Sequence, residues 1–86
     1  MTPLYLAARE GRGEIVQLLL KNKARTETGD IDGDTPLHIA ARKDLRDIAK
    51  ILIKGKASVT LKNNEGQTPP DLAVSPEMKK ILAREE

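Results

Sequence analysis

"TPLHIAARKDLRDIAKILIKGKA", residues 35–57, contains two runs of apolar residues at helical spacing, and this stretch decides the fold. Thr35 can cap a helix with its hydroxyl, and Pro36 suits the first helical position, where a missing N–H costs nothing. A second run carries Ile48 and Ile51, whose spacing places them on one face of a helix. The stretch therefore predicts two short helices joined by a tight turn.

The same pattern recurs at a fixed interval. Thr-Pro pairs begin at residues 2, 35 and 68, each 33 residues after the one before. "TPLYLAAREGRGEIVQLLLKNKA" from Thr2 aligns with residues 35–57 without a gap, and "TPPDLAVSPEMKKILA" from Thr68 follows with three residues fewer after Val74. Because one helix pair cannot bury its apolar face alone, stacking of successive pairs must form the core. The residues expected on the packed face of the second helix in the first pair are Ile15, Leu18 and Leu19.

Two loops of matching sequence connect the pairs, and the first, "RTETGDIDGDT" from residue 25, is rich in aspartate. A helix-loop-helix calcium site begins in a similar way, but it needs glycine at its sixth position and glutamate at its twelfth. Counted from Asp30, those positions hold Thr35 and Ala41. The second loop, "SVTLKNNEGQT", places Asn63 where the first has Asp30. Both are therefore expected at turn positions, where short polar side chains cap the backbone.

The motif Thr-Pro-Leu-His-Ile-Ala at residues 35–40, recurring with this period, resembles the signature of the ankyrin-repeat family. The resemblance implies an all-α solenoid of stacked helix-turn-helix units, with β-hairpin-like finger loops at residues 25–34 and 58–67. It covers the whole chain, as a single domain of residues 1–86. The expected repeats span residues 2–34 and 35–67, followed by a shortened capping repeat at residues 68–86.

Three positions depart from the pattern of that family. Lys23 and Lys56 stand where the second helix of a repeat usually ends in glycine. Asp44 stands at the turn between helices, where the first repeat has Gly11. Because these positions call for a left-handed backbone, which strains a residue with a β-carbon, each lysine is expected to cost stability relative to glycine.

The two ends of the array also differ from its middle. No finger precedes the first unit, so its outward apolar face lacks the polar cover that a terminal repeat needs. We therefore expect a longer array or a partner on this face, and self-association through it is one option. The third unit restarts a helix at Ser75-Pro76. Its polar exterior, expected of a C-terminal cap, comprises Lys79, Lys80, Arg84, Glu85 and Glu86.

The composition narrows the class of protein further. The 86 residues are 38% hydrophobic and 33% charged, too apolar for a disordered chain and too charged for a membrane span. The chain contains no cysteine and no charged-then-apolar leader, which favours an intracellular location, cytoplasmic or nuclear, without membrane insertion. The net charge is +2 and Tyr5 is the only aromatic residue. Nucleic acid is thus not an expected partner, since its readers usually add stacking aromatics or a dense basic stripe.

Nothing in the sequence predicts catalysis. His38 is the only histidine, and there is neither a cysteine nucleophile nor a second histidine to complete a metal pair. The resemblance implies that His38 hydrogen-bonds the backbone of neighbouring turns. We therefore expect no enzymatic activity, no cofactor and no metal site.

The resemblance implies instead a protein-interaction module, which binds a partner through its fingertips and the concave face of its first helices. Ile31 and Tyr5 are the strongest candidates for contact, because an apolar fingertip and a lone aromatic on a first helix should contribute little to the stack. Carried over by position, the surface comprises Tyr5, Arg9, Glu10, Ile31, Asp32, Asp34, Arg42, Lys43, Asn64, Glu65 and Gln67.

Two alternatives stand beside this hypothesis. One is a scaffold segment of a larger ankyrin-repeat protein, with no partner of its own. The other is an electrostatic surface for nucleic acid or a phosphorylated ligand, whose affinity would fall steeply with ionic strength. The basic residues of that second alternative are Arg46, Lys50, Lys54, Lys56 and Lys62.

Overall fold

The computed structural model describes residues 2–27 and 29–83 of the chain. Over these residues it forms helices and turns, and no strand occurs among them. The helices come in pairs, with a tight turn inside each pair, as the repeated pattern predicts. Their bounds are α1 (Pro3–Arg9), α2 (Gly13–Lys21), α3 (Pro36–Arg42), α4 (Arg46–Lys54), α5 (Pro69–Leu72) and α6 (Pro76–Leu82).

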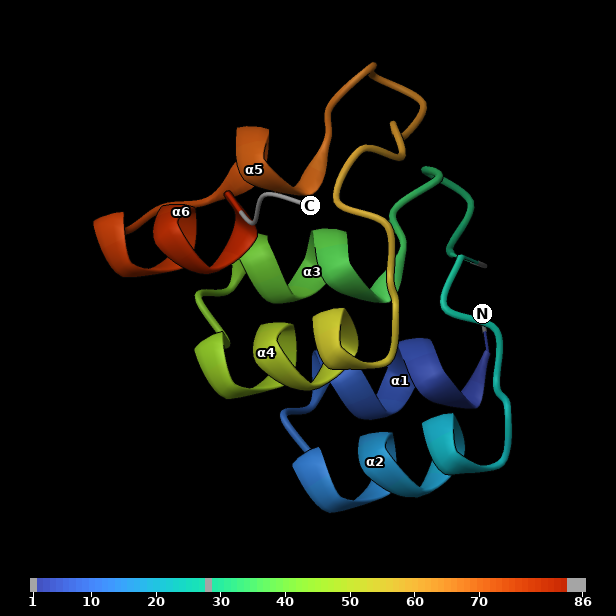
Figure 1. Cartoon of the computed structure of the whole chain (residues 1–86). Coiled ribbons are helices and arrows are strands. Elements are labelled where there is room, and N and C mark those ends of the chain that lie inside the picture. Colours follow the sequence, from blue (N-terminus) through green and yellow to red (C-terminus); the bar gives the residue numbers. More distant parts are fainter. Residues whose placement is uncertain (1, 28, 84–86) are drawn as a thin grey trace.

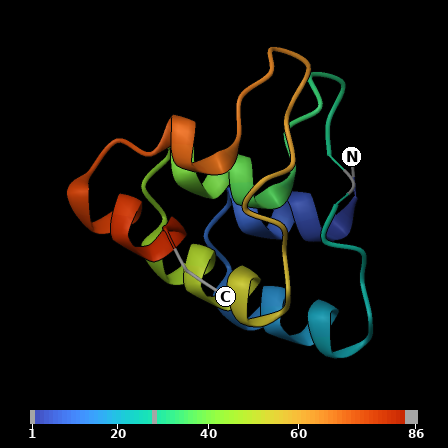
Figure 2. The ribbon, with the colours of Figure 1, turned by 45° about the horizontal axis from the view of Figure 1, so that its top comes forward.

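The helices form two layers (Figure 1). The first helices of the pairs, α1, α3 and α5, pack in a row, and the second helices, α2, α4 and α6, form a parallel row against them. The two long loops project from one side of the stack and lie side by side (Figure 2). The predicted all-α solenoid is confirmed, with each pair packed on the next.

Hydroxyl caps and prolines fix where the helices begin. The Thr2 hydroxyl accepts the N–H of Tyr5 at 3.1 Å, and Thr35 caps α3 in the same way. At the start of α6 the Ser75 hydroxyl accepts the N–H of Met78 at 3.1 Å. A proline follows each of these caps, where its missing N–H and fixed φ suit the first helical turn. Local sequence thus sets these helix starts.

Small residues let the first helices approach one another closely. Ala7 and Ala8 of α1 and Ala40 and Ala41 of α3 are buried, and the most exposed of them shows only 6% of its surface. Close approach of two backbones increases dispersion contacts between them. The largest fully buried apolar side chains around this contact are Leu4, Leu37, Leu52, Met78 and Leu82.

The second helix of the first repeat packs differently from the prediction. Ile15 and Leu18 are 44% and 58% exposed, and Val16 is the buried residue of α2. Their equivalents one repeat later, Ile48 and Ile51, face α2, since a β-carbon on Gly13 would lie only 3.4 Å from the Ile51 side chain. The helical period was thus predicted correctly, but the matching face of α2 is uncovered over the described residues.

The third helix pair is shorter than the two before it. Helix α5 ends at Leu72, and the Ser75 cap starts α6 after a short connection. On α6, Met78 and Leu82 are buried, whereas Lys79 and Lys80 are exposed. Of the polar exterior expected here, Arg84, Glu85 and Glu86 lie outside the described residues.

Left-handed residues end both long second helices. Lys23 and Lys56 have φ values of 66° and 74°, as predicted from their place in the repeat. In each repeat the lysine N–H and the following alanine N–H bond back to carbonyls of the last helical turn, which is a Schellman ending. Asp44, with φ of 59°, makes the left-handed turn that Gly11 makes in the first repeat.

Replacing each left-handed lysine with glycine should stabilise the chain. We expect Lys23→Gly and Lys56→Gly each to raise the free energy of unfolding by roughly 0.5–1 kcal/mol, the relief of strain less the added freedom of the unfolded chain. A change of that size moves the midpoint of a small domain by several degrees. Thermal melts of the single and double variants measure it, and near-additive shifts are expected. Lower midpoints in both single variants would mean that the lysine side chains contribute more than the strain costs.

Candidate functional site

The first finger is closed by its own aspartate. The Asp30 carboxylate accepts the backbone N–H groups of Asp32 at 3.0 Å and Asp34 at 3.1 Å. The Asp30 N–H in turn donates to the carbonyl of Asp34 at 3.0 Å, and Gly33 supplies the left-handed residue with φ of 80°. The side chain of Asp30 therefore caps a turn, which is the role that the repeat alignment predicts.

The second finger repeats this geometry with an amide in place of the carboxylate. The Asn63 side-chain oxygen accepts the N–H groups of Glu65 at 3.0 Å and Gln67 at 2.9 Å. Asn63 also donates its own N–H to the Gln67 carbonyl at 2.9 Å, and Gly66 has φ of 77°. Two different side chains thus produce one turn, because both offer an acceptor oxygen at the same distance from the backbone.

The tips of the two fingers are joined to each other. Asn64 donates its backbone N–H to the Asp32 carbonyl and its side-chain N–H to the Ile31 carbonyl, both at 2.9 Å. Gly33 is needed for this contact, since a β-carbon there would lie 2.7 Å from the Asn64 side-chain oxygen. The Ile31 side chain itself is 91% exposed. An apolar side chain therefore stands in solvent on a backbone that the neighbouring finger holds.

Each finger is also tied to the first helix of the preceding pair. The Tyr5 hydroxyl of α1 donates to the Asp30 carboxylate at 2.6 Å. One repeat later, the ring of His38 on α3 contacts the Gln67 carbonyl at 2.8 Å through Nε2. The Nδ1 atom accepts the N–H of Thr35 at 3.0 Å, so the neutral ring carries its proton on Nε2 and donates to Gln67. Tyr5 and His38 occupy equivalent positions of the repeat, and each hydrogen-bonds a finger to the first helix of the preceding pair.

A buried carboxylate links the first finger to the second. The Asp34 side chain is 4% exposed and forms an ion pair with Arg42 of α3 at 2.5 Å. It also accepts the side-chain N–H of Asn63 at 2.8 Å. Its hydrogen bond to Arg42 raises the pKa of the guanidinium above its ordinary value. Asp34 therefore connects a finger, a helix and the next finger.

These positions correct two expectations. Tyr5 was expected to be exposed and to contribute little to the stack, but it is 3% exposed and holds the first finger. Asp34 was placed at a fingertip, but it is buried at the finger base. Asp30 and Asn63 were not among the expected surface residues, although their equivalence in the repeat indicates a shared role as acceptors. Both Tyr5 and Asp34 are therefore structural, and their side chains offer little surface to a partner.

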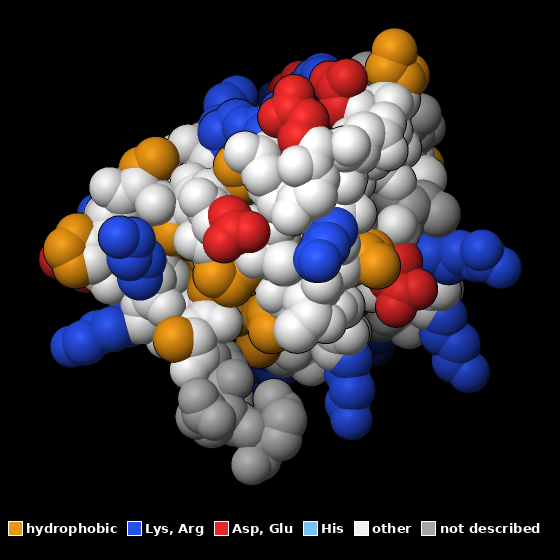
Figure 3. Space-filling view, turned by 90° about the horizontal axis from the view of Figure 1, so that it is seen from above, with side chains coloured by type: hydrophobic (Ala, Val, Ile, Leu, Met, Phe, Trp, Pro, Cys, Tyr) orange, Lys and Arg blue, Asp and Glu red, His pale blue; other side chains and the backbone are white. Residues whose placement is uncertain are grey.

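The other expected surface residues fall into two groups. Ile31, Asp32, Asn64 and Glu65 are exposed and lie together on the two fingertips. A second group lies at the ends of α1 and α3, where Arg42 reaches back to the first finger. Seen from above, acidic and basic side chains lie close together beside a protruding hydrophobic group (Figure 3). The second group consists of Arg9, Glu10, Arg42 and Lys43, and the half-buried Gln67 lies at the base of the second finger.

The Tyr5 ring has an electrostatic role in this network. Burial, followed by the hydrogen bond to Asp30, raises the pKa of Tyr5 to about 12. Burial opposes the charge on Asp30, but hydrogen bonds from Tyr5 and from the backbone of Asp34 and Asp32 outweigh it and hold the pKa of Asp30 below its ordinary value. The Arg9 guanidinium lies 6.0 Å from the centre of the Tyr5 ring. A neutral phenol thus bonds an ionised carboxylate over a wide pH range.

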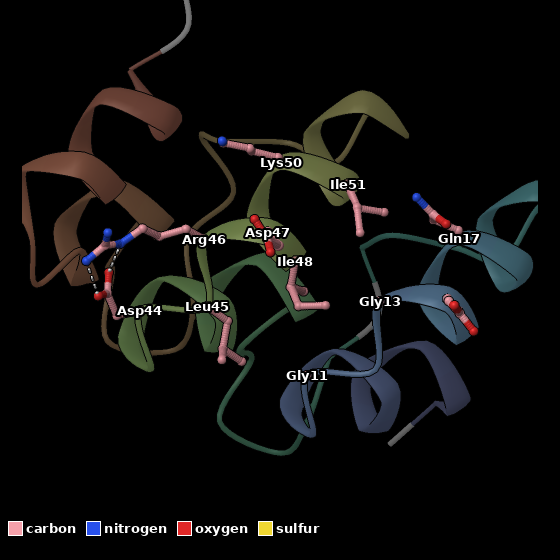
Figure 4. Close-up of a pocket in the computed structure, with 11 residues that line it drawn as sticks. Gly11, Gly13, Gln17, Asp44, Leu45, Arg46, Asp47, Ile48, Lys50 and Ile51 are labelled. Atoms are coloured by element: carbon pink, nitrogen blue, oxygen red, sulfur yellow. Dashed lines mark hydrogen bonds and ion pairs between the residues drawn. The ribbon is translucent and has the colours of Figure 1, made fainter.

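A broad hollow lies elsewhere on the surface, between α2 and α4 (Figure 4). It measures about 860 Å³ and opens to solvent between the two helix starts. Ile48 and Ile51 extend from α4 toward α2, and Gln17 lies opposite Ile51. Across the described residues, no group of three or more histidine, cysteine or acidic side chains is placed to hold a metal ion. None of the residues predicted to bind a protein partner lines this hollow, whereas Arg46 and Lys50 of the electrostatic alternative do.

Stacked helix pairs with tied fingers define a solenoid of the kind that presents an extended surface. Residues 1–63 match a family model described as ankyrin repeats in three copies. The chain belongs to the ankyrin-repeat family. Repeats of this family generally serve as non-enzymatic protein-interaction modules.

One similar solved structure is that of "the ankyrin repeat domain of Bcl-3: a unique member of the IkappaB protein family". It superposes with a TM-score of 0.92 at 31% sequence identity, over 94% of this chain and 36% of that one. The chain thus spans about a third of the length of the relative that it matches. The search of curated proteins found no match. Within the described residues, no helix has the length and apolar character needed to cross a membrane.

The single tyrosine allows the finger contact to be tested by titration. We expect the phenolate absorbance of the folded chain to rise with a midpoint near pH 12. Because the folded pKa is raised, the contribution of Tyr5 to stability is present below about pH 10 and is lost as the pH rises through about 12. The chain unfolded in urea is the control and should titrate near 10. A midpoint near 10 in the folded chain would contradict the bond to Asp30. Tyr5→Phe should show a smaller loss of stability over the same pH range.

Proposed function

We propose that the chain binds a protein partner through the two fingertips, with the exposed ends of α1 and α3 as the flank of the surface. The observation that supports this proposal best is the 91% exposure of the Ile31 side chain. The backbone around it is held by hydrogen bonds, from Asn64 to the Ile31 carbonyl and from the Asp32 N–H to the Asp30 carboxylate. Ile31 makes no contribution to the core, so its burial would come from a partner. Aliphatic anchors of this kind give binding energy when they enter a pocket.

Fixed geometry supports the same proposal. Binding through a loop that is already ordered avoids the conformational entropy that a mobile loop would lose. Here Asp30 closes the first finger, Asn64 holds its tip, and Tyr5 ties its base to α1. The finger therefore offers Ile31 in one position.

Charges around Ile31 favour a partner of particular character. Asp32 and Glu65 are exposed beside it on the fingertips, and no ion pair within residues 2–27 and 29–83 engages either. A complementary partner would therefore present an apolar pocket with basic or hydrogen-bond donor groups at its rim. At the other end of the surface, the exposed Lys43 would meet an acidic group.

The electrostatic alternative is less well supported. Its residues do not form one patch, because Arg46 lies at the start of α4 and Lys54 at its end. Arg46 is paired with Asp44 at 2.9 Å. Hydrogen bonds from Thr68 hold the pKa of Asp71 below its ordinary value, and the nearby charge of Lys62 adds to this effect. A nucleic-acid surface would also lack stacking groups, since the chain's one aromatic residue is buried.

A contact on the uncovered face of the first pair is a second candidate, favoured by a specific observation. Leu6, Ile15 and Leu18 are 39%, 44% and 58% exposed. One repeat later, Ile39 and Ile48 occupy the equivalent places of the first two and are buried against the preceding pair. Another helix pair, in a longer array or in a second copy of the chain, would cover this face in the same way. We propose an intracellular setting for both functions.

The fingertip proposal is tested by truncating its anchor. Against the strongest partner captured from a cell lysate, Ile31→Ala should weaken binding by about 1 kcal/mol or more, as expected of a central apolar contact. Its melting temperature should stay unchanged, since the side chain is exposed. Asn64→Ala should also weaken binding, because the Ile31 backbone loses a hydrogen bond.

The matched control is Ile15→Ala, which removes the same atoms from the uncovered face of α2. If Ile15→Ala abolishes capture and Ile31→Ala does not, the partner lies on the uncovered face and the fingertip proposal fails. Sedimentation of the wild-type chain at increasing concentration then shows whether that partner is a second copy.

A further inference from the structure

Five basic side chains surround the C-terminal ends of α2 and α4. All five are exposed, and none takes part in an ion pair within the described ranges 2–27 and 29–83. Helices α2 and α4 pack side by side with these ends adjacent (Figure 1). This group, named here the lysine face, consists of Lys21, Lys23, Arg25, Lys54 and Lys56.

A small hollow lies within the lysine face. It measures about 310 Å³, and Lys21 and Lys54 stand on its border, one from each helix. Leu20 and Ile51 form its apolar lining, and both are only half buried. Gly55 closes the contact between the helices, since a β-carbon there would lie 2.9 Å from the Leu20 side chain. The hollow therefore combines an apolar floor with a cationic rim.

Helix stability accounts for the positions of only some of these basic residues. Lys21 and Lys54 occupy the last residues of their helices, where a cation favours the exposed carbonyl groups. Lys23 and Lys56 instead hold left-handed backbones, with φ of 66° and 74°, that glycine adopts without strain. Strained backbone positions of this kind are enriched at functional sites. The same choice at equivalent places in two repeats indicates such a role for the charge.

We propose that the lysine face is a second binding surface, which takes an acidic segment of a polypeptide. Its carboxylates would pair with the lysines, and an aliphatic side chain of the segment would enter the hollow between α2 and α4. This surface lies on the second helices and is separate from the fingertips. A polypeptide fits better than nucleic acid because the hollow suits an aliphatic side chain and the face offers no aromatic ring for stacking.

The test uses a fluorescein-labelled peptide in which glutamates flank a central leucine. Anisotropy titration at physiological ionic strength should show binding, and replacing the leucine with serine should weaken it. Lys23→Gly/Lys56→Gly should lose roughly threefold or more in affinity, as expected of two exposed ion pairs, while its melting temperature rises. Lys21→Gln/Lys54→Gln should lose a similar factor in affinity. It removes two charges of the lysine face without changing a left-handed residue, so it tests the proposal even if the glycine variant folds poorly.

The control is Lys79→Gln/Lys80→Gln on α6, which removes the same charge from another part of the surface. It should bind the peptide like the wild type, and so should Ile31→Ala, which separates this surface from the fingertips. Equal losses in the α6 variant and the lysine-face variants would overturn the proposal, since only net charge would then matter. Absence of peptide binding, or tighter binding of a single-stranded oligonucleotide of equal charge, would overturn it as well.

Discussion

The relative position of the two fingers depends on the hydrogen bonds and ion pair of one buried carboxylate, that of Asp34. It joins the first finger to α3 through Arg42 and to the second finger through Asn63. A buried charge is costly unless it is paired and hydrogen-bonded. Any arrangement that separates the fingers would deprive this buried carboxylate of its hydrogen bond from Asn63. The network therefore selects a single relative position of the two fingers.

The apolar core and this polar network have different tasks. Alanines and leucines between the helices stabilise the stack, but they do not determine the orientation of the loops. The loops are placed by side chains that act at equivalent positions of the repeat, Tyr5 and His38 from the helices. Their contacts allow an aliphatic side chain to stand in solvent at a defined place. The position of the fingers thus depends on the polar contacts more directly than on the core.

The period of the repeat allowed the helices, the fingers and the left-handed positions to be predicted, because each depends on residues close in sequence. The roles of Tyr5 and Asp34 could not be predicted, since their partners are 25 and 29 residues away and meet only after stacking. Periodicity also indicated which residues of α2 share a face. Whether that face is buried depends on tertiary packing against another helix pair, which the period does not reveal. Ile15 and Leu18 therefore came out exposed.

Amide hydrogen exchange at Asn64 tests the central claim most directly. The residue is exposed on a fingertip, and its N–H is protected only if it stays bonded to the Asp32 carbonyl of the other finger. We predict that this N–H exchanges slowly in the native chain, and that Asp34→Ala, which removes the buried link between the fingers, abolishes its protection while α1 amides remain protected. Exchange of the Asn64 N–H at the rate of an unstructured peptide in the wild-type chain would contradict the account.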